Sequence, residues 1–136
     1  MSDFDPEALR DWLVDRDVRL RPPADARATA ALFSAFDGAV HPDVLAMYLT
    51  FDGCDQGDFE VDSFISIWPI EMGLEYIRER GIRDQMAFAD VAFSADVALV
   101  SLMEPDAPVA WHDRVSPLCS SIADFWHGFM RGDLRF

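Results

Sequence analysis

The segment MAFADVAFSADVALVSL, from Met86 to Leu102, decides the fold that we expect for this chain. Apolar and β-branched residues fill both halves of the segment, which is typical of strands that pack on a core. Between the halves, Ser94-Ala95-Asp96 supplies the small and polar residues of a short turn. We therefore predict strands at Met86–Phe93 and Val97–Met103, paired as an antiparallel hairpin.

One further strand is expected on each side of this hairpin. The stretch FISIW, from Phe64 to Trp68, carries a strong strand pattern and ends at Pro69. A short strand at Val109–His112 follows the turn at 105–108, which contains two prolines. These strands follow one another along the chain as a meander.

Helices are predicted where capping residues precede apolar residues at three- and four-residue spacing. Five helices are expected. The first begins at Asp5-Pro6-Glu7, the second covers 24–36, and the third begins at His41-Pro42-Asp43. The fourth covers Ile70–Arg80, and the fifth follows Pro117 and is capped by Ser121. We expect the second and third of these to form a helical hairpin. The order of helices, a meander with one inserted helix, and a closing helix predicts an α+β fold. The length of 136 residues suits a single domain, 1–136.

The charge balance limits the classes of partner. The chain has 25 acidic and 11 basic residues, for a net charge of -14. Such a surface repels the phosphates of nucleic acid and the anionic face of a membrane. It attracts a basic protein and speeds the encounter at low salt. The alternative is that the acidity serves only to keep the protein soluble.

Residues that carry chemistry are few. The sequence contains no glycine-rich phosphate loop, no nucleophile elbow and no HExxH pair. We interpret His41, His112 and His127 as helix-terminal or surface histidines. Cys54 and Cys119 lack CxxC spacing, so we expect neither a disulfide nor a zinc site. The sequence therefore predicts a protein that is not an enzyme and that has no metal and no cofactor.

No signal peptide or membrane-spanning stretch is expected. The first residues are acidic and are interrupted by Pro6, which does not match a secretion signal. The apolar runs are too short to span a bilayer. We therefore expect a cytoplasmic protein.

Acidic residues between the third helix and the first strand form the main candidate site for partner binding. Their spacing does not match the calcium loop of an EF-hand, so a solvated loop and a partner-facing loop both stay open. These residues are Asp52, Asp55, Asp58, Glu60 and Asp62.

Tryptophans supply a further candidate, because they are enriched where protein interfaces carry most of their binding energy. Trp68 and Trp126 lie in strongly apolar patterns and are predicted to belong to the core. Trp111 stands beside His112 and Asp113 and is the best candidate for an exposed anchor.

Several motifs follow one another in a fixed order along the chain. They are Pro22-Pro23 before a helix, His41-Pro42 followed by VLAMYLTFDG (44–53), FISIW (64–68) continued by Ile70-Glu71, the hairpin 86–102, and SSIADFWHGFM (120–130). Their order and spacing resemble the SUKH superfamily over about Leu20 to Gly132, leaving an extra N-terminal helix at about 5–15. One departure is Asp52, which stands where the family usually has Asn.

The resemblance implies an α+β domain with a mostly antiparallel sheet backed by helices. Many bacterial SUKH domains are immunity proteins that bind and neutralise a toxin encoded beside them, and others are adaptors related to cell-wall-assembly regulators. The leading expectation is therefore an immunity protein for a basic, cytoplasm-acting toxin such as a nuclease. The acidic residues 52–62 would then mimic phosphates. The alternative is an adaptor or regulatory module that binds another protein. Nothing in the sequence predicts the oligomeric state.

Overall fold

A computed structural model of the chain describes residues 4–54, 65–91, 96–112 and 117–132. Within these ranges the chain forms one five-stranded antiparallel sheet, in which each strand pairs with the next one along the chain. The strands are β1 (Ile65–Ile67), β2 (Gln85–Val91), β3 (Asp96–Ser101), β4 (Val109–Trp111) and β5 (Pro117–Cys119).

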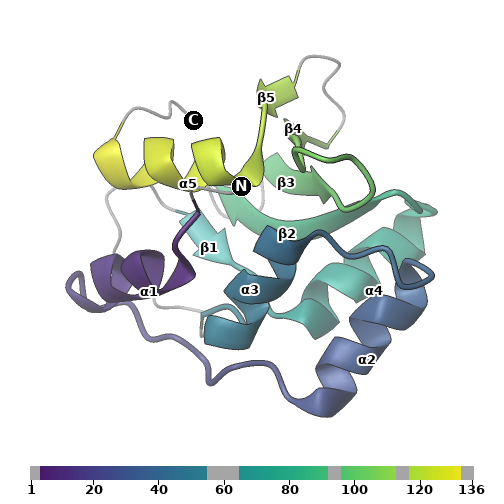
Figure 1. Cartoon of the computed structure of the whole chain (residues 1–136), viewed down its shortest axis with the longest axis horizontal. Coiled ribbons are helices and arrows are strands. Elements are labelled where there is room, and N and C mark those ends of the chain that lie inside the picture. The colour runs from purple at the N-terminus through teal and green to yellow at the C-terminus, as the bar shows by residue number, and fades with distance from the viewer. Residues whose placement is uncertain (1–3, 55–64, 92–95, 113–116, 133–136) are drawn as a thin grey trace.

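Helices cover the sheet, as Figure 1 shows, with α5 on one side and the pair formed by α2 and α4 on the other. Helix α1 packs against α3, and both also contact α5. This arrangement confirms the predicted α+β class. The helices are α1 (Pro6–Val14), α2 (Ala26–Ala35), α3 (Pro42–Thr50), α4 (Ile70–Arg80) and α5 (Ile122–Arg131).

The predicted hairpin is present as β2 and β3, which pair from Gln85 with Ser101 to Val91 with Asp96. A bulge between Ala87 and Ala89 places an extra residue, Phe88, in β2. The ring of Phe88 contacts two rings of α5, at centroid distances of 5.3 Å for Phe125 and 5.7 Å for Trp126. These contacts join the centre of the sheet to the closing helix. Positions 94 and 95 of the predicted turn lie outside the described residues.

Helix ends follow the capping signals of the sequence. Asp5 Oδ1 accepts hydrogen bonds from two backbone N–H groups in the first turn of α1. Asp25 Oδ1 accepts from the N–H of Ala28 at 2.8 Å, which makes α2 begin two residues later than predicted. Ser121 Oγ accepts from the N–H of Asp124 at 3.0 Å and caps α5. The predicted buried positions of Trp68 and Trp126, which are 3% and 0% exposed, are confirmed.

Two sequence predictions about the fold are wrong. The segment after Pro117 was expected only to lead into the final helix, but it forms the edge strand β5, where a proline can stand because the strand is at the edge. The expected hairpin of α2 and α3 is also absent, because α2 packs mainly against α4. Two successive residues with positive φ, Asp37 and Gly38, turn the chain between α2 and α3.

Candidate functional site

Asp52, one of the residues predicted to face a partner, is turned inward instead. It is 8% exposed, and its Oδ1 accepts a hydrogen bond of 2.8 Å from the N–H of Ile70. Pro69, the N-cap residue of α4, has no side-chain group for this task, so Asp52 supplies the missing acceptor. Asp52 is therefore not the exposed residue that was expected, and its role in partner binding stays a prediction. The other four members of the acidic segment lie outside the described residues: Asp55, Asp58, Glu60 and Asp62.

Burial raises the pKa of Asp52 above its ordinary value, although the hydrogen bond from Ile70 and the charge of Arg21 act in the opposite direction. A carboxyl whose pKa is higher in the folded chain binds its proton more tightly there than in the unfolded chain. Its contribution to stability is therefore fully present below the unfolded pKa of about 3.9 and is lost as the pH rises through the folded pKa. At neutral pH the charge on Asp52 costs stability, while its hydrogen bond contributes it.

Replacing Asp52 with asparagine separates these two effects. Asp52→Asn keeps an oxygen for the N–H of Ile70 but removes the buried charge, so we expect equal or higher stability at pH 7. The difference in free energy of unfolding between Asp52→Asn and the original chain should become smaller as the pH drops towards 4. Asp52→Ala leaves the Ile70 N–H without an acceptor, which should cost about 1–3 kcal/mol. Urea unfolding at both pH values measures each effect, and equal losses for Asn and Ala at pH 7 would contradict the capping role.

Trp111, the expected exposed anchor, is also buried. It is 6% exposed and pairs with Ala98 across the β3–β4 ladder. The expectation rested on its polar neighbours in the sequence, but β4 is not an edge strand, because β5 pairs with it on the outer side. The expectation of an exposed Trp111 is therefore wrong, because this side chain belongs to the hydrophobic core.

An acidic hollow of about 960 Å³ lies where three segments of the chain meet. These are residues 38–43, which lead into α3 and form its first turn, residues 102–106 of the turn after β3, and the first turns of α5. Four carboxylates are among its lining residues, and no arginine is among those that the structure describes there. The carboxylates are Asp43, Glu104, Asp106 and Asp124. We call this feature the acidic hollow.

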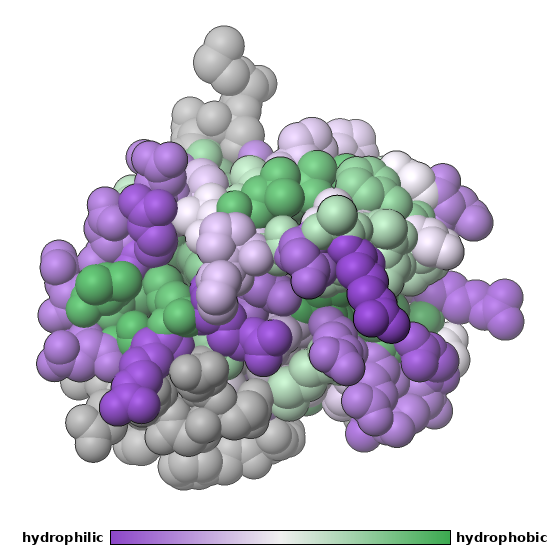
Figure 2. All heavy atoms as spheres, turned by 90° about the horizontal axis from the view of Figure 1, so that it is seen from below, coloured by the Kyte–Doolittle hydropathy of each residue, from purple (hydrophilic) through white to green (hydrophobic). Residues whose placement is uncertain are grey.

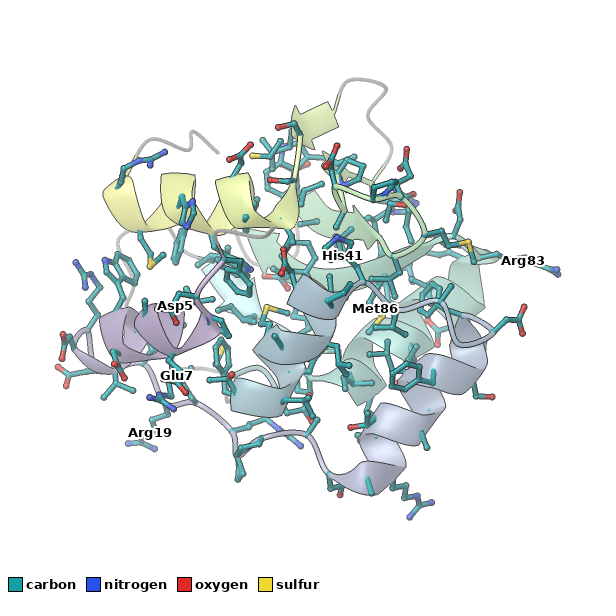
Figure 3. The ribbon with its side chains drawn as sticks, viewed as in Figure 1. Asp5, Glu7, Arg19, His41, Arg83 and Met86 are labelled. Carbon is teal, nitrogen blue, oxygen red and sulfur yellow. The ribbon has the colours of Figure 1, made fainter. Side chains whose placement is uncertain are left out.

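His41 ties two walls of the acidic hollow together. Its Nδ1 accepts a hydrogen bond of 3.1 Å from the N–H of Asp43 and so caps α3. Its Nε2 lies 2.8 Å from the carbonyl oxygen of Pro105. Because a carbonyl oxygen only accepts, Nε2 carries the proton, and the ring is the neutral Nε2–H tautomer. Figure 3 labels His41 at the start of α3. Its interpretation as a helix-terminal histidine is confirmed.

The turn after β3 is further fixed by its own backbone. Ala107 is fully buried and has a φ of 50°, in the left-handed region that costs an alanine about 1–2 kcal/mol. Its N–H donates to the carbonyl of Glu104 at 3.1 Å, and Ser101 N–H donates to the carbonyl of Pro108 at 3.0 Å. The wall that carries Glu104 and Asp106 is therefore held in one conformation by the surrounding structure.

His41→Asn tests whether His41 holds this turn. Asparagine is a good N-cap residue but is too short to reach Pro105, so the cap should survive while the contact to the turn is lost. We expect a loss of stability below about 1 kcal/mol, together with faster hydrogen exchange at the Ala107 amide. His41→Ala, which also lacks the cap, should lose about 1 kcal/mol more. Unchanged exchange in His41→Asn would show that the turn does not depend on His41.

A second groove of about 990 Å³ lies between the segment 21–23, α2 and α4. Five of its lining residues are acidic, but three arginines, Arg21, Arg27 and Arg78, lie among them. One of the five carboxylates is that of Asp52, which already caps α4. Figure 2 views the molecule from the side where α2 and α4 lie, and shows hydrophilic and apolar residues mixed on this face. Its charges are therefore more nearly balanced than those of the acidic hollow.

His112 belongs to a network of polar and aromatic side chains between α4 and the sheet. Its Nδ1 lies 2.5 Å from the hydroxyl of Tyr76, and the guanidinium of Arg80 stacks 3.7 Å from the centre of the same Tyr76 ring. Nearby, Trp68 Nε1 donates to Oδ2 of the buried Asp90 at 2.8 Å. These bonds satisfy buried polar groups and attach α4 to β2 and β4.

Neither protein-family models nor curated proteins match this chain, so the resemblance to SUKH domains stays a hypothesis. Among the residues that the structure describes, no three His, Cys, Asp or Glu side chains are grouped to hold a metal ion. None of the described helices combines the length and the apolar character needed to cross a membrane. The acidic hollow is the feature whose geometry and charge best fit a binding function.

Proposed function

We propose that this chain is an immunity protein, which binds a basic bacterial toxin and neutralises it. The observation that carries the proposal is the acidic hollow, whose described lining residues include four carboxylates and no arginine. The chain as a whole is also negative, with a net charge of -14. Complementary charge of this kind speeds association and selects against partners of the wrong sign.

A protein partner fits the acidic hollow better than a nucleic acid or a metal ion does. Phosphates would be repelled by its carboxylates. A metal ion needs ligands that converge, and the described acidic groups do not cluster in that way. A toxin that acts on nucleic acid must carry a basic cleft, and an acidic inhibitor complements such a cleft. The motif order that resembles SUKH domains supports the neutralising role.

Salt dependence tests the electrostatic part of the proposal. Purified chain mixed with the product of the adjacent gene should form a complex that is visible by size exclusion. When salt rises from about 50 to about 150 mM, the association rate should fall, because screening shortens the reach of the charges to about 8 Å. The dissociation rate should change much less. An association rate that does not change with salt would mean that the acidity serves only solubility. A complex in which the toxin stays active would indicate an adaptor.

A further inference from the structure

We infer that the turn after β3 inserts into a cleft of the protein partner, with Met103 as its apolar anchor; this inference rests on the proposed function, in which the partner is a toxin. In Figure 1 the turn is the green loop that connects β3 to β4. Leu102 and Ala107, at its two ends, are buried, whereas all four residues between them are exposed. Those four residues are Met103, Glu104, Pro105 and Asp106.

Met103 is an unusual residue to expose on such a turn, because methionine is among the side chains most often buried. Among the described residues, the other large apolar side chains that are exposed are Val14 and Leu49, and both lie on helices. Methionine is enriched in protein interfaces, where its flexible side chain adapts to the surface of a partner. A single exposed apolar residue is common on a protein surface, so what distinguishes Met103 is the turn that presents it.

The turn is exposed and nevertheless fixed. Within it, the Ala107 N–H donates to the Glu104 carbonyl at 3.1 Å, and Pro105 restricts one further backbone angle. From α3, the Nε2–H group of His41 donates to the carbonyl of Pro105 at 2.8 Å. Ala107 is fully buried with a φ of 50°. A residue other than glycine persists in this conformation only where its surroundings hold it, and such residues cluster at functional sites.

A fixed and exposed turn is suited to enter a cleft that already exists in the partner. Its backbone loses little conformational entropy on binding, so more of the contact energy appears as affinity. Complexes in which an inhibitor blocks an enzyme commonly form in this way, with little movement of the interface backbone. The turn can therefore place Met103 at one defined position in the partner.

The side chains of the turn indicate the chemistry of that cleft. Met103 requires an apolar or aromatic subsite. Glu104 and Asp106 stand close to it in the sequence, and neither forms an ion pair with another described residue. Both carboxylates are therefore available to basic residues around that subsite. A cleft that binds nucleic acid combines these two features, because aromatic side chains stack on bases and basic groups bind phosphates.

Met103→Ala and Leu49→Ala form a matched pair of variants, because the two side chains are 53% and 50% exposed. Leu49 lies in the last turn of α3 and does not line the acidic hollow. We expect Met103→Ala to bind the adjacent gene product at least about tenfold more weakly, mainly through faster dissociation, and Leu49→Ala to bind within about twofold of the original chain. Surface plasmon resonance measures both rates, and thermal unfolding verifies that each variant is folded. Unchanged affinity in Met103→Ala, or equal weakening in the two variants, would overturn the inference.

His41→Asn tests whether the fixed turn positions Met103. This variant keeps a cap for α3 but loses the bond to Pro105, so we expect binding to weaken about threefold in the original chain. The same substitution should matter much less in Met103→Ala, which has no anchor left to position. A purely structural role of His41 would weaken binding by the same factor in both chains. That outcome of the double-mutant cycle would overturn the positioning role.

Failure of the inference can be distinguished from failure of the proposed function. If the adjacent gene product forms no complex with the original chain, the proposed function is overturned and the inference falls with it. If the complex forms and Met103→Ala binds as tightly as the original chain, only the inference is overturned. A complex that Met103→Ala weakens and Leu49→Ala does not supports both.

Discussion

Replacing Gly73 with alanine is expected to lower the free energy of unfolding by about 3 kcal/mol or more, a large share of the roughly 5–15 kcal/mol that is typical of a single domain. A Cβ atom at this position of α4 would lie 2.1 Å from the carbonyl oxygen of Ala87 and 2.7 Å from Met86 Cε. The Met86 side chain can move, but Ala87 is part of the backbone of β2. The helix could accept the methyl group only by moving away from the sheet.

Gly81→Ala, at the C-cap of the same helix, is the control. Gly81 has a φ of 69°, but no atom lies within 4 Å of where its Cβ would be. Alanine at this position should lower the free energy of unfolding by only about 1 kcal/mol, because the left-handed conformation is unfavourable for a residue with a Cβ atom. Urea unfolding of both variants, extrapolated linearly to water, measures the two losses. Equal losses would mean that the close approach of α4 to β2 does not limit residue 73.

The combined substitution Glu104→Gln/Asp106→Asn/Asp124→Asn, called the hollow triple variant, is expected to weaken binding of the adjacent gene product by about 30-fold or more, equivalent to about 2 kcal/mol. It removes three of the four carboxylates that line the acidic hollow. Charges at the rim of an interface act mainly on association, whereas charges that become buried act on dissociation. Both rates should therefore change if the partner enters the acidic hollow.

The control for this experiment is Glu71→Gln/Glu75→Gln/Glu79→Gln, called the α4 triple variant. It removes the same amount of charge from a face where arginines already balance part of it. It should change the affinity by about threefold or less, and only through association. Surface plasmon resonance gives both rates for each variant. If the α4 variant weakens binding as much as the hollow variant, the acidic hollow is not the interface.

Local signals in the sequence account for the parts of the fold that were predicted correctly. Asp5 and Ser121 cap their helices with side-chain oxygens that bond to backbone groups two or three residues away. The β2–β3 hairpin has seven and six residues in its two strands, long enough to show a strand composition. Strand β5 has three residues and begins at Pro117, and the sequence Pro117-Leu118-Cys119 lacks the run of β-formers that FISIW provides for β1.

The candidate site could not be predicted because it depends on contacts between distant residues. The bond from His41 to Pro105 spans 64 positions, and the one from Asp52 to Ile70 spans 18. In the sequence, Asp43 and Asp124 are first-turn residues that favour a helix dipole, and Asp106 is a turn residue. Only the folded chain brings these carboxylates around one hollow.

The central claim is that this chain neutralises a basic toxin by binding it, and growth of toxin-expressing cells tests that claim most directly. Bacteria that express the adjacent gene product would carry either this chain, the hollow triple variant, or an empty vector. We expect the original chain to restore growth and the hollow triple variant to restore it much less. Cells that stop growing equally with the original chain and with the empty vector would contradict the account.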